Sequence, residues 1–249
     1  MVRAYRYFLP GYTWHLTQKC HKREFLLKFA RDRRRWCHWL FQSKKRYGLR
    51  ILNYNVTSNH IHLLVYDDGR KNAIPRSMQL ISGRVGQEYN QRKSRNGSFW
   101  GDRYHATAVE SGLHLMRCLV YMDLNMVRAG VVRHPSEWEC SGYHELQNIP
   151  KRKRIIDYTC LINLLELNSY TELKATHQRL INEAVKKGNL IREERWTESL
   201  AVGSQTFIED IKGKLGVKGM YRPVSEEKGT WKIKEETLMK QDYFDTKIS

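Results

Sequence analysis

The stretch Thr57-Ser58-Asn59-His60-Ile61-His62-Leu63-Leu64-Val65 decides how the fold of this chain is interpreted. It is an apolar run rich in strand-forming residues, and in a strand His60 and His62 share one face while the apolar residues between them take the other. Two histidines about 7 Å apart on one strand face can converge on a divalent metal if a third ligand comes from another element. Because His-x-His is a short pattern, a strand with two satisfied or exposed histidines remains the alternative.

The segments around this run predict an α/β fold, in the α+β sense, built on an antiparallel sheet. Residues 50–57 alternate in polarity and Ser58-Asn59 forms a turn, which predicts a hairpin with a strand over 60–66. Further strands are predicted over 12–18 and 106–109. Helical spacing of apolar residues, Phe29, Trp36 and Leu40 among them, predicts helices over 25–47, 73–93 and 113–127.

His15, in the first predicted strand, has two interpretations. It could look toward the same site as His60, but the alternation of residues 12–18 favours a simple polar residue on the open face of the sheet.

The charge of the chain predicts a polyanionic partner. The 249 residues carry 44 Lys and Arg against 26 Asp and Glu, a formal charge of +18. Residues 1–150 hold 25 basic and 11 acidic residues, a net charge of +14, together with nine of the ten histidines. The candidate metal ligands therefore lie in the same half of the chain as the excess positive charge that attracts polyanions. This favours chemistry on nucleic acid.

Cysteines and hydropathy bear on the compartment. The five cysteines are far apart, without a Cys-x-x-Cys pair, which argues against a disulfide framework or zinc knuckle and fits a reducing cytosol. No apolar run reaches the length of a membrane span, and no signal peptide is recognisable. We expect a soluble, cytoplasmic protein, associated with the nucleoid if bacterial, with no membrane partner.

The loop over residues 93–104 mixes basic and aromatic side chains. Such a mixture suits single-stranded nucleic acid, where cations follow the backbone and Trp100 or Tyr104 could stack on a base. The alternative is an ordinary loop in which Phe99 and Trp100 plug the edge of the core.

The predicted helix over 113–127 carries a second pair of candidate residues. Its buried stripe is predicted to consist of Leu113, Met116, Val120, Leu124 and Val127. Tyr121 and Asn125 lie off that stripe, one turn apart, so that a phenol and an amide could enter one site together. A tyrosine used only for packing is the alternative.

The basic run Lys151–Arg154 predicts a boundary between a domain over 1–150 and a mainly helical extension over 151–249. Ser169 and Ser204 can each cap a helix of this extension, with Gly188 and Gly216 at the ends. Residues from about 224 onward are polar and charged and are expected to be partly disordered.

Four ordered blocks of the sequence resemble a known family. They are PGYTWHLTQK (10–19), NHIHLLV (59–65), GSFWGDRYHATAVES (97–111) and YMDLNMVRAGVV (121–132). Together they resemble the single-tyrosine HUH transposases (IS200-like), in the branch of REP-associated tyrosine transposases. Two departures from the family pattern are Met126, where a proline usually follows the asparagine, and the block Trp138–Tyr143.

This resemblance implies a ferredoxin-like α/β domain and a metal-dependent endonuclease and strand transferase. His60 and His62 would be metal ligands for Mg²⁺ or Mn²⁺, and Asn125 would be a third ligand or orient the site. Tyr121 would be the nucleophile that forms a 5′-phosphotyrosyl intermediate. The implied partner is single-stranded or hairpin DNA of a repetitive extragenic palindrome, with no small-molecule cofactor, and the protein would be a monomer or homodimer.

Arg95, Trp100, Arg103 and Arg128 are the candidates for DNA contacts. Two alternatives remain open at this stage. A domesticated, cleavage-inactive DNA-binding protein could keep the same fold and charge. An RNA-binding protein with a ferredoxin-like sheet would expose aromatic residues on its strands and would not depend on a metal.

Overall fold

The computed structural model describes residues 8–188, 190–220 and 222–234, and its sheet is built around four antiparallel strands. These are β1 (Thr13–Lys19), β2 (Arg50–Val56), β3 (His60–Tyr66) and β4 (His105–Val109), in the spatial order β2-β3-β1-β4. Helix α1 (Ala30–Tyr47) connects β1 to β2, and α2 (Ala73–Arg92) connects β3 to β4. This β-α-β-β-α-β order is ferredoxin-like and confirms the predicted fold class.

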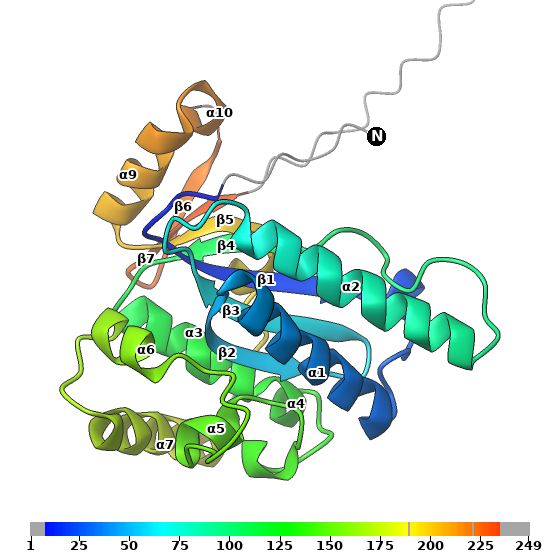
Figure 1. The fold of residues 1–249 in the computed structure, drawn as a ribbon. Coiled ribbons are helices and arrows are strands. Elements are labelled where there is room, and N and C mark those ends of the chain that lie inside the picture. Colours follow the sequence, from blue (N-terminus) through cyan, green and yellow to red (C-terminus); the bar gives the residue numbers. More distant parts are fainter. Residues whose placement is uncertain (1–7, 189, 221, 235–249) are drawn as a thin grey trace, which may run out of the picture.

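Helices α1 and α2 lie together on one face of the sheet (Figure 1). Trp36 and Leu40 of α1 are fully buried against it, as their spacing predicts, and so is Ile81 of α2. Gly48, with φ +68°, ends α1 in the left-handed conformation that favours glycine. Phe29 was predicted to lie on the buried stripe of this helix, but that was wrong: α1 begins only at Ala30, and Phe29 is 58% exposed.

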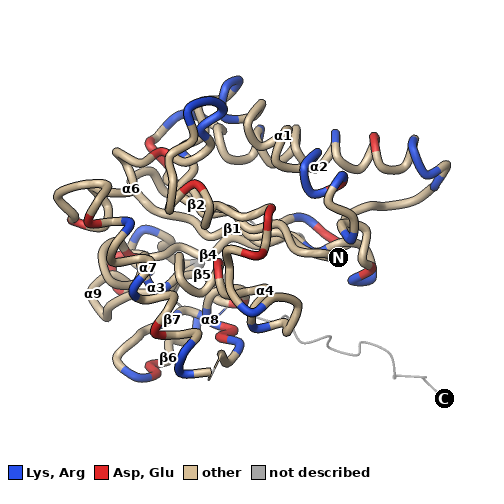
Figure 2. Tube along the Cα trace, turned by 90° about the horizontal axis from the view of Figure 1, so that it is seen from below, with Lys and Arg blue, Asp and Glu red and all other residues tan. Residues whose placement is uncertain are grey.

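The opposite face of the sheet is covered by α3 (Leu113–Asp123) and the short α4 (Asn125–Arg128), as the edge-on view in Figure 2 shows. The predicted stripe of this helix was right for Met116 and Leu124, which are buried, but wrong for Leu113, which is 62% exposed. The residues that α3 buries most deeply are Leu115, Cys118, Leu119 and Met122. They follow the same helical spacing, displaced around the axis, and this rotation brings Tyr121 inward as well.

The chain beyond residue 150 adds both helices and strands. The helices are α6 (Tyr158–Leu164), α7 (Tyr170–Lys187), α8 (Arg195–Glu198), α9 (Gln205–Leu215) and α10 (Val217–Met220). The predicted caps of α7 and α9 are confirmed, since the side chains of Ser169 and Ser204 accept hydrogen bonds from the amides of Glu172 and Phe207. Three further short elements precede α6: η1 (His21–Arg23), η2 (Pro135–Glu137) and α5 (Tyr143–Gln147).

The three additional strands were not predicted. They are β5 (Ser199–Gly203), β6 (Val224–Glu227) and β7 (Thr230–Lys234). β5 pairs in parallel with β4, so the sheet extends to seven strands in the order β2-β3-β1-β4-β5-β7-β6. The expectation of disorder from residue 224 was wrong for 224–234, which form the β6–β7 hairpin, while 235–249 lie outside the described residues. The domain boundary at residue 150 stays a prediction.

Helix α7 is held to the core by a buried polar pair. His177 Nε2 lies 2.9 Å from Asp123 Oδ2, and both side chains are fully buried. Asn53 of β2 donates a 3.1 Å hydrogen bond to the other carboxylate oxygen of Asp123. The extension is thus connected to the first four strands both through the sheet and beneath it. None of the helices in the described part of the chain has the length and hydropathy needed to cross a membrane.

Candidate active site

A cavity of about 300 Å³ lies on the face of the sheet that α3 and α4 cover. It is lined by Thr17, Lys19, Arg23, Asn59, His60, His62, Tyr121, Asn125, Arg128, Ala129, Arg192 and Thr197. The structure therefore brings together His60, His62, Tyr121 and Asn125, which the sequence predicted as one site. All of them come from one chain, so the histidine pair and the tyrosine share a cavity without a second copy.

His62 is buried at the centre of this site, 1% exposed. Its Nδ1 atom lies 2.9 Å from Nε2 of His15, and its Nε2 atom lies 3.0 Å from the amide nitrogen of Asn125. Burial, followed by the neighbouring His60 and His15, holds the pKa of His62 well below its usual value. The ring is therefore neutral near pH 7, as a metal-binding imidazole must be.

His60 lies at the partly exposed rim of the cavity. Its Nδ1 atom is 2.7 Å from Oδ1 of Asn59 and 2.9 Å from Oγ1 of Thr57. The Thr57 hydroxyl donates to the main-chain oxygen of His60, so the imidazole Nδ1–H is the donor to the Asn59 oxygen. Burial, with smaller contributions from Lys19 and Arg192, lowers the pKa of His60 to about 4.

Tyr121 projects from α3 and packs close to the histidines. Its ring centroid lies 6.2 Å from that of His62, with the two planes at 87°. The guanidinium of Arg128 lies 4.2 Å from the Tyr121 ring centroid and donates a 3.1 Å hydrogen bond to the Tyr121 carbonyl. Burial raises the pKa of Tyr121, while Arg128 and then Arg192 lower it. The phenol is therefore protonated at rest, next to cations that favour its anion.

The donor set fits a divalent ion held by nitrogen and amide oxygen. His60 and His62 are neutral, and the Asn125 amide lies against His62, where rotation of the amide group would present its oxygen. No cluster of three or more His, Cys, Asp or Glu side chains suited to a metal occurs among the described residues. A third protein ligand at this site would therefore be the amide of Asn125.

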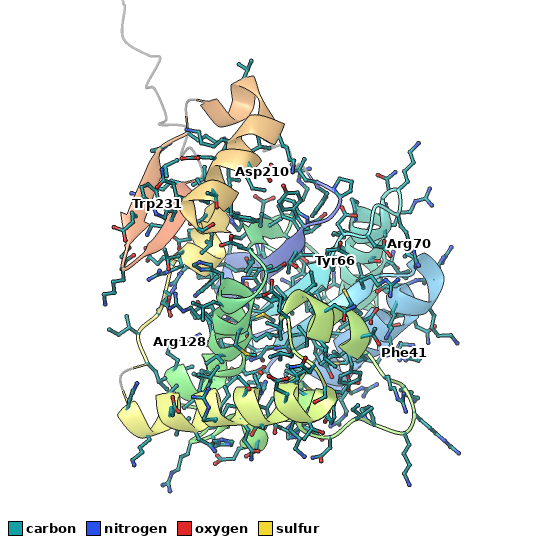
Figure 3. The ribbon with its side chains drawn as sticks, turned by 90° about the vertical axis from the view of Figure 1, so that its left-hand side faces the viewer. Phe41, Tyr66, Arg70, Arg128, Asp210 and Trp231 are labelled. Carbon is teal, nitrogen blue, oxygen red and sulfur yellow. The ribbon has the colours of Figure 1, made fainter. Side chains whose placement is uncertain are left out.

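The remaining surface of the cavity is cationic. Lys19, Arg23, Arg128 and Arg192 line it, and its lining contains no Asp or Glu. Arg128 comes from the end of α4 and is labelled in Figure 3. Four cations around a small cavity attract an anion such as a phosphodiester.

Of the four residues predicted to contact DNA, Arg128 alone lines this cavity. Arg95 donates to the side chain of Asn90 and the carbonyl of Ser98. Trp100 is buried and its indole N–H donates to the carbonyl of Ser82, so its ring plugs the edge of the core. Arg103 is exposed on the same loop.

Several residues of the site, Lys19 and Arg23 among them, were missed by sequence reasoning. Arg192 and Thr197 line the cavity from the extension, which was predicted to be separate. The favoured interpretation of His15 as a polar residue on an open sheet face was wrong, since His15 is fully buried and contacts both His62 and the carbonyl of Trp196. Only the polar alternation in residues 12–18 hinted at this role.

Comparison with known proteins gives one family match. Residues 9–122 match the family model described as "Transposase IS200 like". Asn125 and Arg128 lie just beyond the matched residues. None of the curated proteins compared with the chain matches it.

Two solved structures resemble parts of the chain. A REP-associated tyrosine transposase bound to a REP hairpin is 21% identical, with 58% of this chain and 84% of that chain covered and a TM-score of 0.46. A candidate transposase from Deinococcus radiodurans R1 is 15% identical, with 42% and 84% covered and a TM-score of 0.33. Because both TM-scores are below 0.5, the relation of this chain to transposases rests on the family match of residues 9–122.

Proposed function

From the match of residues 9–122 to the IS200-like transposases, we propose that the protein cleaves and rejoins single-stranded DNA through Tyr121. The observation that carries the proposal is that Tyr121, His60, His62 and Asn125 line one cationic cavity. A packing tyrosine and a structural histidine pair would have no reason to share such a cavity.

The proposed reaction is a transesterification. The Tyr121 oxygen attacks the phosphorus of a phosphodiester, the bond to the 3′ oxygen breaks, and a 5′-phosphotyrosyl protein and a free 3′-hydroxyl result. The phenol loses a proton and the departing oxygen gains one, so no water is consumed. Because the phosphodiester bond energy is kept in the covalent intermediate, a 3′-hydroxyl can later attack the phosphotyrosine and rejoin strands.

The side chains of the cavity have separate tasks in this reaction. Arg128 lies against the Tyr121 ring and favours the phenolate, whose pKa burial otherwise raises. Lys19, Arg23 and Arg192 would bind the phosphates on either side of the scissile bond. His60, His62 and Asn125 would hold Mg²⁺ or Mn²⁺, which when bound polarises the scissile phosphate and stabilises charge on the leaving oxygen.

We propose hairpin-forming repetitive DNA as the substrate, on the basis of the four sequence blocks that resemble REP-associated tyrosine transposases. The protein would recognise the double-stranded stem by its shape, and the single strand beside the stem would enter the cavity. Arg95 and Arg103, on the loop after α2, are proposed to contact DNA outside the cavity. Trp100 was also predicted to contact DNA. Because its ring is buried, it would act by supporting this loop.

The test is formation of a covalent protein–DNA adduct. Purified protein is incubated with labelled hairpin DNA from its own genomic flanks, with Mn²⁺ or chelator, and separated on denaturing gels. We expect a metal-dependent adduct that disappears in Tyr121→Phe and persists in Tyr143→Phe, a matched control because Tyr143 is equally buried but lies outside the cavity. Binding of every flanking hairpin without an adduct would contradict the proposal and indicate a DNA-binding protein that does not cleave.

A further inference from the structure

The two histidines of the cavity are oriented by different parts of the chain. His60 is held by Asn59 and Thr57, its neighbours in sequence. His62 instead contacts His15 of β1, and His15 contacts the main-chain carbonyl of Trp196, 181 residues further along the chain. The orientation of His62 therefore depends on a segment that lies outside the family match.

The carbonyl of Trp196 sets the direction of this chain of hydrogen bonds. A carbonyl oxygen can only accept, so His15 Nδ1, 2.8 Å away, must carry the proton. His15 is fully buried and therefore neutral, which leaves a lone pair on its Nε2. That lone pair faces His62 Nδ1 at 2.9 Å and accepts its N–H. His62 is then left with its own lone pair on Nε2, the nitrogen beside Asn125.

The packing keeps these partners in place. The ring centroids of His15 and His62 are 5.1 Å apart and the ring planes differ by only 12°, so the two rings lie nearly in one plane and the hydrogen bond between them can run along that plane. The Thr107 hydroxyl of β4 donates to the carbonyl of Ser199 at 2.6 Å and lies 3.3 Å from that of Trp196, which ties the junction of α8 and β5 to the sheet. The Trp196 side chain is 1% exposed, and its ring lies 6.2 Å from that of Tyr121. The Trp196 carbonyl is thus held in place by Thr107 and by the buried ring of its own residue.

We propose that His15 is a positioning residue, through which the Trp196 carbonyl of the C-terminal extension fixes His62 as the tautomer with its Nε2 lone pair facing the cavity. This inference rests on the proposed function for the use of that lone pair, as a ligand for a divalent ion. When the hydrogen-bond partner that fixes the tautomer of a metal-binding histidine is removed, metal affinity commonly falls by about 10- to 100-fold. The extension would in this way take part in the chemistry as well as in the fold.

The first experiment measures the tautomer directly in the protein without metal or DNA. In protein with ¹⁵N-labelled histidine, two-bond nitrogen–proton correlations at pH 7 distinguish a protonated ring nitrogen from a bare one. We expect a protonated Nδ1 and a bare Nε2 for both His15 and His62. A protonated Nε2 on His62 would overturn the inference, whether or not the protein cleaves DNA.

The second experiment asks whether His15 acts through His62. Mn²⁺ affinity is measured without DNA for His15→Leu, which removes the acceptor, and for His15→Gln, whose amide can donate to Trp196 and accept from His62. We expect about 10- to 100-fold weaker binding for His15→Leu with a change in the His62 tautomer, and partial recovery for His15→Gln. Unchanged Mn²⁺ affinity in a folded His15→Leu protein would overturn the inference.

His105→Leu is the matched control. His105 lies on β4 and its Nε2 also contacts a carbonyl of the extension, that of Ser199 at 2.9 Å, but it does not line the cavity. This variant should lose stability without changing the His62 tautomer. Since neither readout uses DNA, a failure of Tyr121 to form an adduct would reject the proposed function and leave these results interpretable.

Discussion

The cavity has two walls of different origin. The extension wall consists of Arg192 and Thr197, and the core wall consists of the lining residues before residue 150, which are Thr17, Lys19, Arg23, Asn59, His60, His62, Tyr121, Asn125, Arg128 and Ala129. Every group proposed to react or to hold a metal is on the core wall. The extension wall supplies a cation, and the neighbouring Trp196 carbonyl orients His62 through His15. The groups proposed to react or to hold a metal thus come from residues 1–150, and the extension adds a carbonyl that orients one of them and a further cation.

This separation has a physical reason. The core wall is formed by adjacent strands β1 and β3 and by the helices after β4, so its geometry follows from one compact folding unit. The extension reaches the same site because β5 pairs with β4, which places the preceding helix α8 next to β1 and β4. Changes in the extension wall can therefore alter affinity and pH response while the reactive set stays intact.

The largest expected effect comes from breaking the core wall. His60→Ala should reduce adduct formation about a thousandfold or more, because a lost metal ligand removes several kcal/mol of transition-state stabilisation. Hairpin binding, measured by fluorescence anisotropy in chelator, should change little because the cations remain. Single-turnover adduct formation gives the rate. His38→Ala, a histidine on α1 outside the cavity, is the control, and an equal loss in both variants would count against a special role for His60.

Most of the core wall could be predicted from the sequence, because it depends on local patterns. Alternation located the strands that carry His15 and His60, and glycine or serine caps located the ends of several helices. The spacing of Tyr121 and Asn125 predicted that both could enter one site, and both line the same cavity. The phase of α3 could not be fixed in this way: apolar residues occur on more than one of its faces, and packing on the sheet selects Leu115 and Leu119 over Leu113.

The extension wall could not be predicted, because it depends on contacts between distant residues. The polar face of β1 is covered by Trp196 and its neighbours, and no local pattern around His15 encodes a partner 181 residues away. Strand β5 is short and pairs in parallel with β4, an arrangement with no turn signal between its partners. The basic run Lys151–Arg154 also suggested a separate unit, although Arg192 lines the cavity.

An intermediate effect is expected from pH, and it compares the two walls directly. Burial raises the pKa of Tyr121, so the phenolate is the minor form and the cleavage rate should rise about tenfold per pH unit between pH 7 and 9. Arg128 lowers this pKa more than Arg192 does. The pH–rate profile of Arg128→Ala should therefore move to higher pH further than that of Arg192→Ala. A flat profile would show that deprotonation of Tyr121 does not limit the rate, and equal displacements would remove the distinction between the walls.

The smallest effect is expected from the extension wall alone. Arg192 is exposed, and its guanidinium is shared with Glu198 at 3.0 Å, so it is only partly available to a phosphate. Arg192→Ala should weaken hairpin binding by about threefold to tenfold and reduce the slope of log affinity against log salt by about one. Lys187→Ala removes the same charge from an exposed position on α7 outside the cavity and should change the slope less. If both variants lower the salt slope equally, Arg192 contributes only to the general positive charge of the protein. The Trp196 carbonyl would then be the one group by which the extension still contributes to the described site.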